Sequence, residues 1–100
     1  MDKRTIVWTT RASNEIRSIL EFYTERNQST VYSRWLLNEV NYRIKLIVLF
    51  PRIGRQTEQK GAYLFPFHHY GIIYRFTRKQ LFILSIWDFR QNPNDRIDSK

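Results

Sequence analysis

The strongest constraint on the fold lies in the last third of the chain, where two apolar segments flank a short polar one. Residues 70–76 and 81–87 are rich in β-branched and aromatic side chains, and Thr77-Arg78-Lys79-Gln80 separates them. This pattern predicts a β-hairpin. Residues 81–86 are apolar on both faces apart from Ser85, which is typical of a central strand that is covered on both sides. The hairpin therefore predicts a sheet whose central strand comes late in the chain.

Two amphipathic helices are predicted before the sheet. Residues 5–8 form a short β-branched and aromatic segment, which favours a first strand. Apolar residues then recur at helical spacing in one segment that ends near Asn27 and in a second that Pro51 ends. The apolar stripes are Ala12, Ile16, Ile19, Leu20 and Tyr23, then Tyr32, Leu36, Val40, Ile44 and Ile47, with Trp35 and Leu37 widening the second. The short linker predicts an antiparallel helix hairpin.

The order of elements indicates an α+β fold. A polar, basic loop is expected from Pro51 to Gly61, and a strand over residues 62–67, where Pro66 favours a sheet edge or a bulge. The fold is then two-layer, with an N-terminal strand, the helix hairpin and a three-stranded antiparallel meander completing one sheet. The other sheet face should have less cover, and the functional surface is expected there. Residues 1–100 should form a single domain with a loosely ordered tail over residues 94–100.

The charge of the chain is strongly basic and unevenly placed. Lys and Arg number 17 against 9 Asp and Glu, and the net charge is +8. Residues 43–96 hold ten basic and three acidic residues, whereas residues 1–42 hold six and five. This asymmetry predicts an acidic or polyphosphate partner for the later half, with a merely solubilising excess as the alternative.

Several classes of protein are disfavoured by the composition. The chain has no cysteine, so disulfide frameworks and thiolate metal sites are excluded, and we expect no metal and no cofactor. The N-terminus lacks the apolar core of a secretory signal, and the longest apolar runs are too short to span a bilayer. We therefore expect a cytoplasmic protein without a membrane partner.

Four segments together carry a family resemblance. They are Trp8-Thr9, Phe50-Pro51-Arg52-Ile53-Gly54-Arg55, Tyr70-Gly71-Ile72-Ile73-Tyr74-Arg75 and the run from Ile83 to Pro93 that contains Trp87-Asp88-Phe89-Arg90. In this order and spacing the chain resembles the RelE/ParE toxins of type II toxin–antitoxin systems, from Val7 to Pro93. The resemblance implies a RelE-like fold, growth inhibition, plasmid stabilization and a cognate antitoxin that forms a hetero-oligomer with the toxin.

The resemblance leaves two possible targets, the ribosome and DNA gyrase. RelE-like members cleave messenger RNA on the ribosome, using Lys and Arg with a His or Tyr near the C-terminus, and ParE-like members poison DNA gyrase. This chain has Tyr63 and Gly71 where many relatives carry Arg, Asp88 where they often carry His, and no Tyr after Tyr74. We therefore favour a ParE-like gyrase poison. The alternatives are a ribosome-dependent endoribonuclease, a non-toxic basic nucleic-acid-binding module, or a degenerate toxin.

The candidate site residues come from the later half of the chain. Arg90 is the first candidate, both as a catalytic cation and for binding a phosphate or an acidic patch, and Arg90→Ala is expected to abolish toxicity while leaving the fold intact. An ion pair of Arg90 with Asp88 or Asp95 is equally consistent with the sequence. Arg75 is a second catalytic candidate, against a structural ion pair with Glu58 or Asp88.

Other candidates have weaker support. Arg52, Arg55 and Lys60 form a loop cluster that could steer phosphate or could simply be solvated. His68, His69 and Asp88 are candidate acid–base groups, although a hairpin tip is the simpler role for the two histidines. Strand aromatics can stack on bases, but a core position is favoured for them and for the first two tryptophans. These residues are Tyr63, Phe67, Tyr70 and Tyr74, with Trp8 and Trp35.

Overall fold

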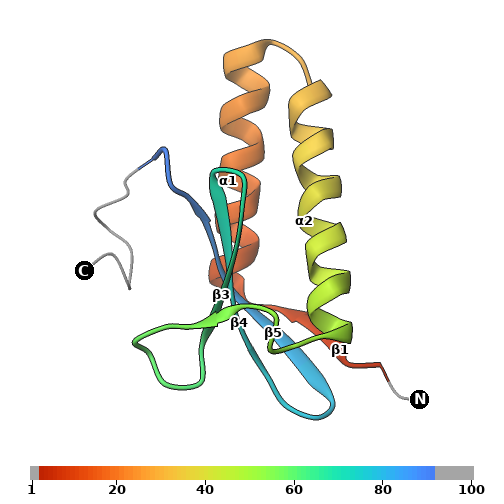
Figure 1. Cartoon of the computed structure of the whole chain (residues 1–100). Helices are drawn as coiled ribbons and strands as arrows, with labels where there is room; N and C mark the ends of the chain where they lie inside the picture. The colour runs from red at the N-terminus through yellow and green to blue at the C-terminus, as the bar shows by residue number, and fades with distance from the viewer. Residues whose placement is uncertain (1–2, 92–100) are drawn as a thin grey trace.

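The computed structural model describes residues 3–91. Seven elements follow in order (Figure 1): β1 (Thr5–Trp8), α1 (Thr10–Asn27), α2 (Val31–Leu49), β2 (Arg55–Gln56), β3 (Tyr63–Phe67), β4 (Tyr70–Phe76) and β5 (Gln80–Asp88). This is the predicted two-layer α+β order. The expectations for the tail at residues 94–100 and for Asp95, Asn92 and Pro93 lie outside the described residues.

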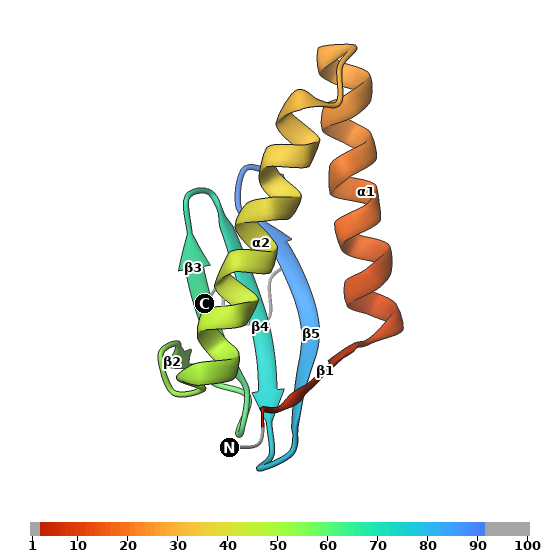
Figure 2. The ribbon, with the colours of Figure 1, turned by 90° about the vertical axis from the view of Figure 1, so that its right-hand side faces the viewer.

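Both helices end where the sequence predicts, at Asn27 and just before Pro51. The Thr9 side chain accepts a hydrogen bond from the Ala12 backbone N–H at 3.1 Å, which caps α1. Gln28, with a left-handed φ of 52°, ends α1 and turns the chain into α2. Phe50 caps the other end of α2, directly before Pro51. The two helices run antiparallel, and in Figure 2 α2 lies in front of the sheet while α1 stands to its right.

The sheet is mixed and has five strands in the order β1-β5-β4-β3-β2. Strand β5 is flanked on both sides, by β1 in parallel and β4 in antiparallel orientation, so the predicted central strand is confirmed. The segment predicted as a loop from Pro51 to Gly61 contains the short strand β2, whose Arg55 pairs with Leu64. Because β2 pairs with only the first two residues of β3, Pro66 lies on an edge, as predicted.

Helix α1 protects the part of β5 that β1 does not reach. Strand β1 pairs with residues 80–83 of β5. Beyond them, Glu15 Oε1 accepts hydrogen bonds from Ser85 Oγ at 2.7 Å and from the Ile86 backbone N–H at 3.0 Å. A charged side chain on an exposed strand edge prevents pairing with another chain. The carboxylate of Glu15 therefore ties the helix layer to the free edge of the central strand.

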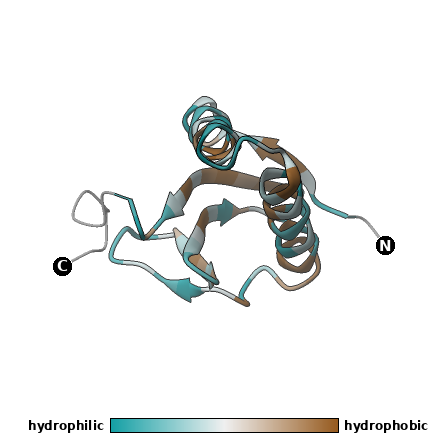
Figure 3. Ribbon diagram, turned by 90° about the horizontal axis from the view of Figure 1, so that it is seen from above, coloured by the Kyte–Doolittle hydropathy of each residue, from teal (hydrophilic) through white to brown (hydrophobic). Residues whose placement is uncertain are grey.

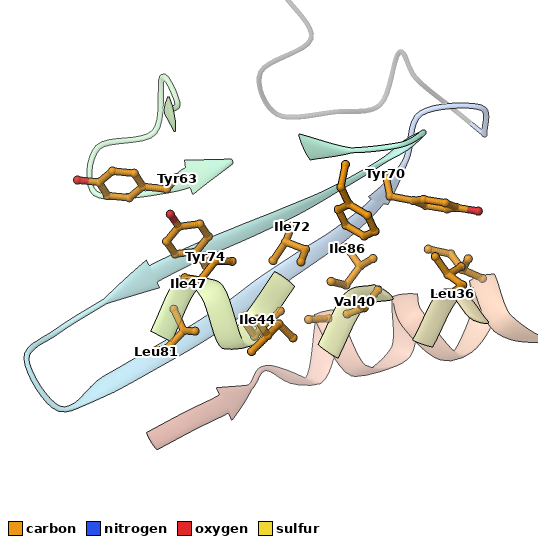
Figure 4. Close-up of a cluster of buried hydrophobic side chains, with 14 of the residues drawn as sticks. Leu36, Val40, Ile44, Ile47, Tyr63, Tyr70, Ile72, Tyr74, Leu81 and Ile86 are labelled. Carbon is orange, nitrogen blue, oxygen red and sulfur yellow. The ribbon is translucent and has the colours of Figure 1, made fainter. Parts of the chain in front are cut away.

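The main core lies between the helix hairpin and the sheet. Figure 4 shows Val40 and Ile44 of α2 facing Ile72 and Ile86 of the sheet. All four of the strand aromatics assigned to the core are buried, and Figure 3 shows the most hydrophobic strands beside the helices. Trp35 differs from its predicted core position, because it is 40% exposed on α2. Trp8 is partly buried against the core.

The opposite sheet face has less cover than the helix side, as the sequence predicts, but it is not bare. Ala62, Leu64, Ile73 and Trp87 form a second buried cluster there, against which Leu84 and Phe89 pack. A Cβ on Gly71 would lie 2.7 Å from Leu64 Cδ1 and 3.3 Å from the Phe89 ring. Gly71 therefore leaves the space that Phe89 and Leu64 fill. Neither described helix combines the length and hydropathy that a membrane span requires.

Candidate functional site

The Arg90 side chain sits in a cluster of tyrosines at the end of the sheet. Its Nη2 donates hydrogen bonds to Tyr70 Oη at 2.6 Å and to Tyr32 Oη at 3.1 Å. The same guanidinium group lies over the rings of Tyr23 and Tyr70, at 5.2 and 5.4 Å from their centroids. Tyr32 and Tyr70 are themselves joined at 2.6 Å. Three elements, α1, α2 and β4, thus hold the guanidinium group of Arg90, whose side chain is still 41% exposed.

Asp88 is the buried carboxylate of this cluster. Its side chain is 1% exposed, and its Oδ2 accepts a hydrogen bond from Tyr23 Oη at 2.8 Å. Its Oδ1 accepts one from the Arg90 backbone N–H at 3.0 Å and lies 3.6 Å from Arg90 Nε. The predicted ion pair between Asp88 and Arg90 is therefore present. It fixes the turn after β5 and holds the guanidinium against the tyrosines.

The surroundings keep Arg90 charged and keep Tyr23 and Tyr70 neutral. Partial burial opposes the charge on Arg90, but the hydrogen bond to Tyr32 and the phenolic oxygens of Tyr70 and Tyr23 raise its pKa above the ordinary value. Burial raises the pKa of Tyr23, and the hydrogen bond to Asp88 adds to the effect. Burial and the hydrogen bond to Tyr32 raise the pKa of Tyr70. The guanidinium group of Arg90 thus stays positively charged at physiological pH.

These shifts predict a loss of stability in alkali. Burial also raises the pKa of Tyr74, so three tyrosines have a pKa above 10.0 in the folded protein. Their contribution to stability is complete below the unfolded pKa of 10.0, and it is lost as the pH rises from there towards the folded values, because only the unfolded chain then ionises freely. Urea midpoints should fall above pH 10, and fall less steeply in Tyr70→Phe. Equal slopes in the two proteins would contradict the assignment.

The two histidines lie at the turn between β3 and β4, the role favoured from the sequence. His68 has a left-handed φ of 53°, and its Nε2 is 3.1 Å from Glu39 Oε1 on α2. Its ring also packs beside Trp35 at 5.2 Å. The carbonyl of His69 accepts a hydrogen bond from the Phe89 N–H at 2.8 Å. The hydrogen bond to His68 and the charge of Arg43 outweigh desolvation and lower the pKa of Glu39.

Arg75 lies on the other sheet face from Arg90. Ile73 belongs to the second buried cluster, whereas Tyr74 packs in the main core, so Arg75 returns to the face of Ile73. Its guanidinium group is next to Gly61, where an added Cβ would be 3.4 Å from Nη1. Among residues 3–91, Arg75 has no ion pair with Glu58 or any other acid. The structure therefore separates the two catalytic candidates.

The three predicted loop cations have different surroundings. Arg52 donates to Tyr63 Oη at 3.2 Å and lies 5.4 Å from the centroid of the Phe76 ring. Arg55 belongs to β2, and Lys60 to the loop that precedes β3. All three are exposed. Within the described part of the chain, no group of three His, Cys, Asp or Glu side chains could hold a metal ion.

Sequence reasoning missed the helical half of this cluster. Tyr23 and Tyr32 were assigned to the apolar stripes of the two helices, and both rings do pack against the core. Their hydroxyl groups reach Asp88 and Arg90, which lie 65 and 58 residues away in sequence. A tyrosine in place of Phe or Leu near the linker end of each helix was the available signal, since a buried hydroxyl needs a partner. We name Tyr23, Tyr32, Tyr70, Asp88 and Arg90 the Arg90 cluster.

Comparisons with known proteins give the family and the fold. The model of the ParE toxin of the type II toxin–antitoxin system parDE matches residues 6–93. The chromosomal ParDE toxin–antitoxin system from P. aeruginosa is similar, with a TM-score of 0.58, 18% identity and 83% of this chain and 92% of that chain covered. The E. coli DinJ–YafQ toxin–antitoxin complex has a TM-score of 0.55 and 15% identity, covering 89% and 96%.

At sequence identities of 18% and 15%, the similarity to these two structures supports the fold alone. No curated protein sequence matches the chain. The family model covers residues 6–93, which include both helices and all five strands described above except Thr5, the first residue of β1. On that match, the chain belongs to the ParE toxin family of type II toxin–antitoxin systems.

Proposed function

We propose that the protein inhibits growth by binding DNA gyrase and that a cognate antitoxin neutralises it in the cytoplasm. The observation that carries the gyrase proposal is the burial of Asp88, the residue that ends β5. Its carboxylate is buried and held by Tyr23 and Arg90. An acid–base catalyst must reach the proton it transfers, and a carboxylate enclosed in this way is unsuited to that task. The family model, which is that of ParE toxins, supports the same target.

The separation of Arg75 from Arg90 also favours binding over catalysis. Stabilising a charged phosphorane requires cations that converge on one position. Arg90 faces the tyrosines beside the helices, whereas Arg75 lies on the face with Ile73 and Trp87. A ribosome-dependent endoribonuclease is the second candidate, because Arg75 is exposed and has no ion pair within residues 3–91. The ribosome could supply the remaining orientation.

The proposed antitoxin contact is on the outer side of the helix hairpin. A groove of about 430 Å³ is lined there by Trp8, Ile16, Leu20 and Leu37, with Arg17 and Glu21 among its polar residues. Apolar grooves between helices accept an amphipathic partner helix. The two similar structures named above are toxin–antitoxin systems, which supports a hetero-oligomer of the same kind.

Two parallel assays separate the proposed targets. The purified protein is added to gyrase with relaxed plasmid, and to a translating ribosome reaction with a defined messenger. We expect loss of supercoiling and accumulation of cleaved DNA in the first assay, and intact messenger in the second. Codon-positioned messenger cuts with normal supercoiling would replace the gyrase proposal with the nuclease. Normal growth on induction, with nucleic-acid binding in vitro, would indicate a non-toxic binding module, and normal growth with antitoxin binding a degenerate toxin.

A further inference from the structure

Six cations gather at the end of the molecule where the β4–β5 hairpin turns. They come from the residues just before β1, the end of α2, the turn that follows α2, and the hairpin itself, which lie together in the lower part of Figures 1 and 2. Thr5 N donates to Lys79 O at 2.8 Å, and Arg4 Nε donates to Thr77 O at 2.6 Å, so β1 is fastened to the hairpin. We call this surface the basic end and define it as Lys3, Arg4, Lys45, Arg52, Arg78 and Lys79.

Two of these cations are fixed by an aromatic ring. The guanidinium groups of Arg4 and Arg52 lie 5.3 and 5.4 Å from the centroid of Phe76. No ion pair joins any cation of the basic end to an acidic residue in the described range 3–91. Asp2, the neighbour of Lys3 in sequence, lies outside that range. The basic end therefore concentrates positive charge that no described side chain neutralises.

An apolar pocket opens between these cations. It has a volume of about 370 Å³ and is lined by Ile6, Val48 and Leu49 together with Lys3, Arg4 and Lys45. Leu49 is 60% exposed, and Phe50 and Ile53 beside it are also exposed. Ligand pockets in proteins begin at about 300 Å³ and combine an apolar lining with a few polar groups. The pocket is large enough for one branched or aromatic side chain from a partner.

We propose that the basic end binds an acidic segment of a partner protein, with one apolar side chain in this pocket and carboxylates on the surrounding cations. Charge complementarity selects an anionic partner. The exposed apolar side chains favour a protein segment over nucleic acid, whose backbone offers nothing to bury against Leu49 and Ile6. A concave pocket for a single side chain also fits a peptide better than the flat surface of an anionic membrane.

This surface is distinct from the Arg90 cluster. Tyr32 and Lys45 lie near opposite ends of α2, separated by 13 residues or about 20 Å along the helix axis. The contact therefore does not depend on the gyrase proposal. A toxin variant that has lost growth inhibition through Arg90 should still bind the acidic segment.

The test measures binding of a short labelled peptide made of Asp and Glu with one central Leu. Fluorescence anisotropy follows the full-length protein and four variants. Lys45→Glu and Leu49→Ser alter the pocket, whereas Arg34→Glu and Val31→Ser make the same changes at exposed positions near the start of α2. We expect each pocket variant to raise the Kd about tenfold or more, a change of about 1.4 kcal/mol. The two control variants and Arg90→Ala should leave the Kd within about twofold, well below that change.

Four outcomes would overturn the proposal. Equal weakening by Arg34→Glu would mean that net charge alone drives binding. Unchanged affinity when the central Leu of the peptide is replaced by Ser would remove the role of the pocket. Tighter binding to single-stranded DNA, or to phosphatidylserine vesicles, with no effect of Leu49→Ser would assign the surface to nucleic acid or to a membrane. Absence of peptide binding at low ionic strength would remove the surface altogether.

Discussion

Replacing Arg90 with alanine is expected to abolish growth inhibition while leaving the protein folded. The substitution removes the single guanidinium group that Tyr32, Tyr70 and Asp88 hold in place at the end of β5. A charged side chain positioned in this way can bind an acidic or phosphate group bidentately. Colony formation after induction should rise from that of the toxin to that of an empty vector. Urea denaturation of the purified variant measures the remaining stability.

The structure adds a stability cost that the sequence did not indicate. Without Arg90, the buried carboxylate of Asp88 loses its ion pair, and we expect a loss of about 1–3 kcal/mol. Tyr74→Phe is the matched control, because it removes two hydrogen bonds of a buried hydroxyl at a similar cost without touching Arg90. Growth inhibition should survive Tyr74→Phe and be lost in Arg90→Ala. Equal toxicity of the two variants would reject a role for Arg90.

The backbone arrangement was largely predictable because it depends on local signals. Helical periodicity, the Thr9 cap and Pro51 set the bounds of the two helices, and the apolar run before Trp87 indicated the central strand. Strand β2 was missed because two residues carry no alternation. The cover on the second face was missed because Phe89 follows the last strand and packs back over Gly71, a tertiary contact without a sequence period.

The side of Arg75 follows from simple alternation along β4, but the side of Arg90 could not be predicted, because it depends on a bulge in β5. Strict alternation from Leu81 would place Ile83 and Trp87 on the same face of β5. In the pairing with β4, however, Ile83 lies opposite Tyr74 and Ser85 lies opposite Ile73. Leu84 is therefore an extra, bulged residue in β5. Ile86 consequently shares the main core with Ile83, and Trp87 joins the second cluster. The same shift brings Asp88 towards Tyr23, and with it Arg90.

Gly54 is the position where a single methyl group should cost the most stability. An added Cβ would lie 2.7 Å from the Leu64 carbonyl oxygen and 2.8 Å from Tyr74 Oη. The carbonyl belongs to β3 and cannot rotate away, and Tyr74 Oη accepts from the Gly54 N–H at 3.0 Å while it donates to Pro51 O at 2.7 Å. Gly54→Ala must therefore displace β2 or break these hydrogen bonds. We expect a loss of about 3 kcal/mol from overpacking and lost bonds.

Gly61→Ala is the control for Gly54→Ala, because it removes the conformational freedom of a glycine without creating a close contact. Gly61 has a φ of +83°, but an added Cβ there would meet nothing nearer than Arg75 Nη1 at 3.4 Å. Backbone strain alone should cost about 1–2 kcal/mol. Urea denaturation of both variants should therefore show the larger loss for Gly54→Ala, and an equal or smaller loss would contradict the close-packing argument. Since Arg52 precedes Gly54 in the same turn and lies against Phe76, a displaced turn should also weaken the basic end, which peptide binding to Gly54→Ala would detect.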